Sequence, residues 1–397
     1  MSRPIGIDLF AGAGGMTLGF EQAGFDVIAA VEVDPILCAV HESNFPRTTI
    51  FCRSVAEIRG SEIRDRLGIG DRDIDVVFGG PPCQGFSLIG KRALDDERNQ
   101  LVFHFLRVID ELKPKYFVME NVKGMVTGKH KQVITEIIQR VADMGYQITE
   151  PYQVLNAFHY GVPQDRERLF LLGARQDCPR SNYPLPQTKP AKTKRKLAKI
   201  LQGLPSSPTV ADALFDLPDA DQMSVLWEQD WVEIDLGQPS DYVKKLRGTM
   251  ADPLDYAQPR SWNPTLMTSS ARTKHTATSI ARFAETIPGT VEPISRFLKL
   301  DPDGICNTLR AGTPSSRGAF TSPRPIHPIV PRCITVREAA RLHSYPDWFR
   351  FHVTKWHGCR QIGNSVPPYL ARAVAAEIIQ VLQIKPRKPR TPLTLQN

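Results

Sequence analysis

Cys83 stands at a position where a thiol could act as a nucleophile. The segment Gly79-Gly80-Pro81-Pro82 precedes it and ends a buried strand predicted over residues 74–78. Open parallel α/β sheets bind their ligands at the carboxyl ends of their strands, so this turn would present the thiol to a crevice. A structural cysteine in the core is the alternative, because free cysteine is among the residue types most often buried.

Charged side chains adjoin two further predicted strands. Glu120 ends the strand at 116–120 and should therefore face the same crevice as Cys83. A carboxyl group near a nucleophile favours covalent catalysis assisted by an acid or a hydrogen-bond partner. Arg166 and Arg168 stand at the start of another apolar strand, where two guanidinium groups would reach the rim of the crevice. A surface cluster of ion pairs is the alternative for these arginines.

A glycine-rich loop, residues 8–15 (DLFAGAGG), lies between the first predicted strand and the first helix. Such a loop lets a ligand approach the backbone, and Glu32, at the end of the second strand, is placed to hold a ribose hydroxyl pair. The glycines alone fit NAD, FAD, S-adenosylmethionine or a tight structural turn. Asp8 would repel a pyrophosphate, which favours a ligand that carries a positive group.

The elements that position these residues follow an α/β pattern. Residues 1–175 alternate short apolar strands with amphipathic helices, which is typical of a doubly wound, mostly parallel sheet. Strands are predicted at 5–10, 26–31, 74–78, 116–120 and 168–174, and helices at 16–23, 35–45, 58–67, 101–112 and 131–144.

The α/β pattern stops after residue 175. Prolines, hydroxyl groups and basic residues dominate residues 176–332, which predicts a second, smaller, irregular and β-rich domain. Regular structure resumes in residues 333–384 with a helix at 336–342, where Thr335 and Glu338 have capping-box spacing, and a helix at 369–382. The basic tail, residues 385–397, is expected to be disordered.

Composition narrows the class of protein. A net charge of +8 is compatible with a polyanionic partner, and basic or hydroxyl-rich runs at 189–196, 268–276 and 310–318 have the chemistry of phosphate contacts. No apolar run is long enough to span a bilayer and no signal peptide is apparent, so we expect a cytoplasmic protein. The seven scattered cysteines include no C-x-x-C pair, and we expect neither a disulfide framework nor a metal site.

In combination, these motifs resemble those of the cytosine-5 DNA methyltransferases, in particular the bacterial or phage modification type. The resemblance spans nearly the whole catalytic part, and six motifs occur in the family's order: residues 8–15, 80–87 (GPPCQGFS), 120–122 (ENV), 164–168 (QDRER), 337–342 (REAARL) and 361–368 (QIGNSVPP). One departure is Cys52-Arg53-Ser54-Val55, where the family commonly has an acidic residue followed by isoleucine at the turn that binds adenine. This departure leaves the contact of Ser54 with adenine open.

The resemblance implies a fold, a reaction and the residues that perform it. The fold would be that of the S-adenosylmethionine-dependent methyltransferases, and residues 176–332 would be the target-recognition domain. Cys83 would attack carbon 6 of a flipped-out cytosine, Glu120 would bind or protonate N3, and Arg168, with Arg166 as the weaker candidate, would contact the base. The cofactor S-adenosylmethionine would be bound by Asp8, Phe10, Ala11, Gly12, Gly14, Gly15, Glu32, Pro81, Asn364 and Val366.

The same resemblance implies duplex DNA as substrate, a monomer, and a possible cognate restriction endonuclease that acts on the same site. A tRNA cytosine-5 methyltransferase is the alternative, although such enzymes usually carry a Cys-Phe-Thr signature that this sequence lacks. A catalytically inactive DNA-binding regulator would not require the intact set of Cys83, Glu120 and arginines. A nicotinamide dehydrogenase would leave Cys83 and Glu120 unexplained.

Overall fold

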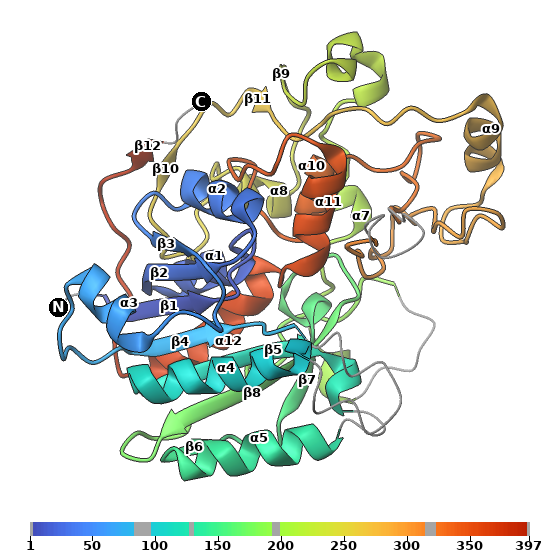
Figure 1. The fold of residues 1–397 in the computed structure, drawn as a ribbon. Helices are drawn as coiled ribbons and strands as arrows, with labels where there is room; N and C mark the ends of the chain where they lie inside the picture. Colours follow the sequence, from blue (N-terminus) through green and yellow to red (C-terminus); the bar gives the residue numbers. More distant parts are fainter. Residues whose placement is uncertain (1–2, 83–96, 127–130, 193–198, 314–322, 395–397) are drawn as a thin grey trace.

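An eight-stranded mixed sheet forms the centre of the protein (Figure 1). The computed structural model describes residues 3–82, 97–126, 131–192, 199–313 and 323–394. Strands follow the order β3-β2-β1-β4-β5-β8-β6, with β7 also paired to β8. The first five strands along this order are parallel, whereas β6, β7 and β5 run antiparallel to β8. The strands are β1 (Ile5–Leu9), β2 (Asp26–Glu32), β3 (Thr49–Cys52), β4 (Val76–Gly79), β5 (Tyr116–Val122), β6 (Tyr146–Ile148), β7 (Gln153–Asn156) and β8 (Glu167–Arg175).

Helices cover both faces of this sheet, as the doubly wound prediction requires. Val76 and Phe78 of β4 belong to the same apolar cluster as α1 (Gly15–Ala23) and α12 (Pro368–Val381), whereas Val77 points to the opposite cluster. This alternation is the period of two of a strand buried on both faces. The opposite face is covered by α3 (Gly60–Leu67), α4 (Glu97–Leu112) and α5 (Lys131–Asp143), and α2 (Pro35–Asn44) packs beside β2 and β3.

The chain returns to the sheet through α12 after more than 150 residues of irregular structure. Helix α12 packs closely against α1, where a Cβ at Gly19 would be 2.4 Å from that of Ala371. Helix α10 (Val336–Leu342) has the predicted capping box, with Thr335 and Glu338 as its two members. The sequence pattern did not predict α11 (Lys355–Asn364), β3, β6 or β7, and most other predicted element ends lie within three residues of those observed.

Residues 176–332 contain small sheets and short helices. Strands β9 (Val232–Glu233) and β11 (Leu266–Met267) pair with each other, and β10 (Arg260–Ser261) is the third strand of this region. The helices are α6 (Lys199–Gln202), α7 (Val210–Leu214), α8 (Asp241–Leu246) and α9 (Ala277–Glu285). Buried ion pairs join this region to α10, because Arg341 Nη1 lies 2.6 Å from Asp216 Oδ1 just after α7. Short 3₁₀ helices occupy 123–126, 157–160, 220–222 and 224–227.

The basic tail is ordered against the body of the protein up to residue 394, so the prediction of disorder is wrong for this part. Strand β12 (Leu393–Thr394) pairs with β10, and Arg3 Nη1 donates a hydrogen bond of 2.7 Å to the carbonyl of Arg387. The tail therefore bridges the start of the chain and the irregular region (Figure 1). Within the described ranges, no helix has the length and apolar character needed to cross a membrane.

Candidate active site

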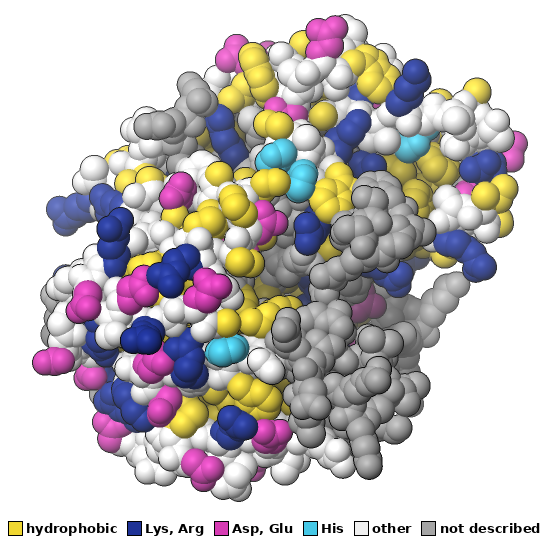
Figure 2. Space-filling model, in the orientation of Figure 1, with side chains coloured by type: hydrophobic (Ala, Val, Ile, Leu, Met, Phe, Trp, Pro, Cys, Tyr) yellow, Lys and Arg dark blue, Asp and Glu magenta, His cyan; other side chains and the backbone are white. Residues whose placement is uncertain are grey.

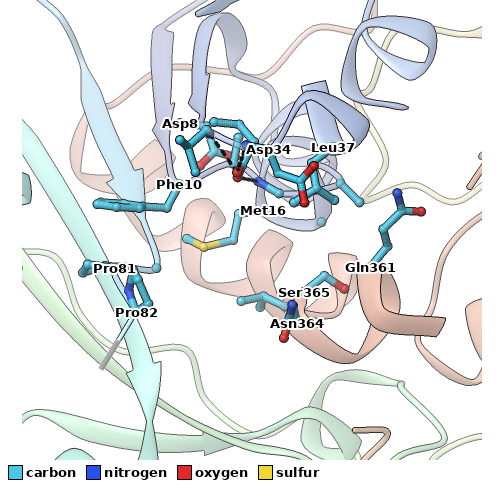
Figure 3. A pocket seen from close by; sticks show the side chains of 18 of the residues that line it. Asp8, Phe10, Met16, Asp34, Leu37, Pro81, Pro82, Gln361, Asn364 and Ser365 are labelled. Atoms are coloured by element: carbon cyan, nitrogen blue, oxygen red, sulfur yellow. Dashed lines mark hydrogen bonds between the residues drawn. The ribbon is translucent and has the colours of Figure 1, made fainter. Parts of the chain in front are cut away.

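A cavity of about 630 Å³ opens at the carboxyl ends of β1, β2, β4 and β5. Its wall combines the loop after β1, the end of β2, the turn after β4 and the end of β5 with the segment that returns at residues 357–366 (Figure 3). Eleven of the predicted site residues line it: Asp8, Phe10, Ala11, Gly12, Gly15, Glu32, Pro81, Glu120, Arg168, Asn364 and Val366. Segments more than 300 residues apart in the chain thus form one site.

The loop after β1 needs glycine for conformational reasons. Gly14, the N-cap residue of α1, has a φ of 95°, and a Cβ there would be 2.3 Å from the Phe45 ring. Such a positive φ is strained for residues with a side chain. Gly14 does not line the cavity, so its contribution is to the turn that brings Gly12 and Gly15 to the wall.

Glu32 is held at the wall by backbone amides. Its Oε2 accepts a hydrogen bond of 2.9 Å from the Gly12 amide, and Oε1 accepts from the amides of Val33 and Asp34. Burial raises the pKa of Glu32, while these amides partly counteract the rise. The carboxylate therefore has a fixed position beside the glycine-rich loop.

Glu120 and Arg168 form a largely buried ion pair in the same cavity. Arg168 Nε lies 2.8 Å from Glu120 Oε1, and the two side chains are only 13% and 12% exposed. Because β5 and β8 are antiparallel, the pairing of Val122 with Arg168 brings this arginine to the carboxyl end of β5. Burial raises the pKa of Glu120, and the positive charges of Arg168 and Arg166 oppose that rise. A carboxyl group tuned in this way can exchange a proton with a bound base.

Arg166 lies behind the cavity and is fully buried. Its guanidinium donates hydrogen bonds to the carbonyls of Leu309, Gly363 and Ser365, at 2.8 to 2.9 Å. The carbonyls of Gly363 and Ser365 flank Asn364 on the returning segment, whereas that of Leu309 belongs to the irregular region. The structure therefore places Arg166 where it supports the wall of the cavity, two residues away from an arginine that faces the interior.

Cys83 lies outside the described residues, but the turn that leads to it is described as far as Pro82. Pro81 and Pro82 line the cavity, and the carbonyl of Pro81 accepts a hydrogen bond of 3.0 Å from Asn121 Nδ2. Asn121 follows Glu120 directly on β5. The turn that precedes Cys83 is thus hydrogen-bonded to β5, the strand that carries Glu120.

The sequence analysis missed several residues of the wall. Asp34 caps α2 by accepting a hydrogen bond from the Ile36 amide, and an aspartate before Pro35 at a helix start was the available signal. Arg53 also lines the cavity, as does Gln361 on the missed helix α11, and so does Ser54, whose contact the sequence left open. The remaining unpredicted wall residues include Ala13, Met16, Leu37, His357, Arg360 and Ser365.

Comparison with known proteins shows the family. Residues 5–380 match the family model described as C-5 cytosine-specific DNA methylase. The type II methyltransferase M.XorII of Xanthomonas oryzae pv. oryzae is 60% identical over 382 residues, which cover 96% of this chain and 86% of that protein. M.AgeI of Thalassovita gelatinovora is 32% identical over 436 residues, and the match covers 94% of this chain and 98% of that protein. The chain therefore belongs to the C-5 cytosine-specific DNA methylase family.

Within that family the protein is a DNA (cytosine-5-)-methyltransferase similar along its length to type II modification enzymes. A solved prophage-encoded chain from E. coli, assigned as a DNA modification methyltransferase, superposes with a TM-score of 0.75 at 34% identity and covers 96% of this chain and all of the other. The Dnmt2 methyltransferase of S. pombe superposes with a TM-score of 0.59 at 14% identity and covers 96% and 100%. That distant likeness concerns the fold alone.

Proposed function

We propose that the protein transfers the methyl group of S-adenosylmethionine to carbon 5 of a flipped-out cytosine in duplex DNA, with Cys83 as the nucleophile. The main support for the proposal is that candidate cofactor-binding groups and a candidate catalytic pair line the same cavity. Asp8, Glu32 and the glycine-rich loop form one end, and the Glu120–Arg168 pair forms the other. Proximity of this kind is a large part of enzymatic rate enhancement.

The wall of the cavity fits the proposed cofactor. Asp8, Glu32 and Asp34 supply carboxylates for positive and hydroxyl groups, and Phe10, Ile36, Leu37 and Val55 supply apolar surface for a purine. The loop and Glu32 would hold the ribose, and Ser54 stands near the same end. Bound there, S-adenosylmethionine would supply an electrophilic methyl group.

The chain's own residues would activate the cytosine. The Cys83 thiolate would form a bond to carbon 6, and carbon 5 would then take the methyl group as the methyl–sulfur bond breaks and leaves the cofactor as a neutral thioether. Glu120 neutralises N3 by proton donation or hydrogen bonding, and Arg168 orients its carboxyl group and contacts the base. Loss of the carbon 5 proton to water would restore the double bond between carbons 5 and 6, expel Cys83 as a thiolate and release 5-methylcytosine. Arg166 would act from behind, as a positioning residue.

Residues 176–332 are proposed as the target-recognition domain, with residues 333–384 completing the catalytic domain. On the face shown in Figure 2, acidic and basic side chains are intermingled over the lower part of the molecule, whereas the upper right-hand part shows mostly basic ones. Basic and hydroxyl side chains would bind DNA phosphates and help repay the unstacking of the flipped base. We further propose that the enzyme acts as a monomer in the cytoplasm, with a restriction endonuclease of the same specificity as possible companion.

Bisulfite sequencing of duplex DNA treated with purified protein and S-adenosylmethionine tests this function. We expect protected cytosines at one recurring sequence, no protection with Cys83→Ser, and full protection with Cys178→Ser, which removes a thiol that does not line the cavity. Methylation of tRNA in place of DNA, or an active Cys83→Ser variant, would contradict the proposal.

A further inference from the structure

Three buried polar side chains form a chain directly behind the glycine-rich loop. Thr17 Oγ1, in the first turn of α1, lies 2.6 Å from Asp8 Oδ2 and 3.1 Å from Nε2 of His41 on α2. Asp8 is 1% exposed, and Thr17 and His41 are fully buried. Of the three, only Asp8 lines the cavity, so the other two support it from the side that faces the protein.

The hydrogen bonds of this chain have one consistent direction when Asp8 is ionised. A carboxylate only accepts, so Thr17 donates to Asp8 and must accept from the Nε2–H of His41. The opposite ring nitrogen, Nδ1, then carries only a lone pair, and it has no hydrogen-bond partner among the described residues. A proton on Asp8 Oδ2 would reverse the direction of both hydrogen bonds, so that Thr17 would donate to Nε2 of His41. The ring proton would then lie on Nδ1 as a buried, unpaired N–H, which is the less tolerated arrangement. Burial lowers the pKa of His41 to about 3, so the ring is neutral at pH 7.

No positive group balances Asp8 within the described part of the chain. The groups around it are Glu32 from β2, the hydroxyl groups of Thr17 and Tyr345, and the neutral His41 ring. Burial raises the pKa of Asp8 to about 8, Glu32 adds to the rise, and the hydrogen bond from Thr17 opposes it. The positive end of α1 also favours the ionised form. The pKa of Asp8 is therefore close to neutral pH, where a positively charged ligand would shift the carboxyl to its ionised form.

We propose that Thr17 and His41 are positioning residues that hold the Asp8 carboxyl ready for a cationic ligand, and that binding of S-adenosylmethionine releases the proton of Asp8. The inference rests on the proposed cofactor, whose sulfonium and ammonium groups supply the missing positive charge. Binding a cation to a protonated acid must displace the proton, so cofactor affinity and pH are linked.

Titration calorimetry of the purified protein with S-adenosylmethionine measures this linkage. Experiments at one pH in two buffers of different ionisation enthalpy count the protons released. The wild type should release nearly one proton at pH 7 and almost none at pH 9, and its affinity should rise about tenfold between these values. Asp8→Asn should bind weakly, without proton release, and with no such rise.

Variants at Thr17 separate positioning from simple packing. Thr17→Val keeps the shape but removes the hydrogen bond that favours ionised Asp8, so affinity at pH 7 should fall about tenfold and level off at a higher pH than in the wild type. Thr17→Ser should restore the wild-type profile. Thr48→Val is the matched control, because it removes a hydroxyl that donates to the Val27 carbonyl and does not contact Asp8.

The outcomes distinguish this inference from the proposed function. A wild type that binds no S-adenosylmethionine at any pH would refute the cofactor assignment. A wild type that binds it with equal affinity from pH 6 to 9, or a folded Thr17→Val variant with an unchanged profile, would overturn the inference and leave the function intact. Thermal unfolding monitors folding, and His41→Leu, which removes the donor to Thr17, replaces Thr17→Val if the latter does not fold.

Discussion

The carboxylate of Glu120 lies against the backbone of Gly80, so closely that a Cβ at residue 80 would be 2.6 Å from Oε2. Strands β4 and β5 are parallel neighbours, with Gly79 paired to Met119, and their ends therefore meet at the same edge. The turn that leads to Cys83 thus touches the candidate acid directly. A side chain at residue 80 would push this carboxyl away from its position.

Gly80→Ala should reduce methylation far more than stability. The added methyl group would displace the Glu120 carboxyl, which is the flexible end of its side chain, and displacement by about 1 Å can cost about 100-fold in rate. Single-turnover methylation and urea unfolding measure the two effects. Gly203→Ala serves as control, since a Cβ there meets nothing within 4 Å. Equal rates for the two variants would show that the contact is dispensable.

Arg168→Gln should change how methylation depends on pH. Burial raises the pKa of Glu120 and Arg168 opposes that rise, so removal of the guanidinium should raise the pKa further. If turnover needs protonated Glu120, the methylation rate of Arg168→Gln should decline at a higher alkaline pH than that of the wild type. The maximal rate should fall roughly 10- to 100-fold. The single-turnover rate measured from pH 6 to 10 tests this shift. Lys123→Gln, at an exposed ion pair with Glu167, should leave the profile unchanged, and a downward shift in Arg168→Gln would contradict the assignment.

Arg166→Met should destabilise the protein by about 3 kcal/mol or more, because three buried carbonyls lose their donor. Cofactor affinity should fall as well, since two of these carbonyls flank Asn364. Chemical unfolding and calorimetric binding give the two values. Arg180→Met, on the surface, should change stability by less than about 0.5 kcal/mol. If Arg166→Met has normal stability and cofactor affinity but a reduced methylation rate, Arg166 instead contacts the base.

Glu338→Gln should destabilise the protein at pH 7 but much less in acid. Glu338 is buried, which by itself would raise its pKa, but the paired Arg332 guanidinium and the capping hydrogen bonds lower it to about 2. A pKa below the ordinary value gives stability that is present above about pH 4.5 and disappears as pH falls toward 2. The expected loss is about 3 kcal/mol at pH 7.

Urea unfolding of the wild type and Glu338→Gln at pH 7 and at about pH 2.5, close to the folded-state pKa of Glu338, measures this difference. Glu136→Gln removes a comparable carboxylate from an exposed i,i+4 pair with Arg140 and should have little effect at either pH. A loss of the same size at both pH values would mean that the charge of Glu338 is not its source.

Local sequence determined the features whose causes are local. The glycines and prolines after β4 end that strand, the capping box of Thr335 and Glu338 starts α10, and apolar runs specify the central strands. The order of six motifs was sufficient to predict the family and eleven of the residues that line the cavity. Short elements such as β3, β6 and β7 were missed because three or four residues carry too little periodicity, and their pairing partners stabilise them.

Only the tertiary structure decided what the individual charged side chains do. Arg166 and Arg168 belong to one motif, yet one is held by carbonyls 143 to 199 residues away and the other pairs with Glu120. Thr17 and His41 are unremarkable in the sequence; Thr17 meets Asp8, and His41 on α2 meets Thr17 on α1, only in the folded protein. The reason is physical: burial, hydrogen-bond partners and nearby charges set the role of an ionisable group, and these come from segments that are distant in the chain.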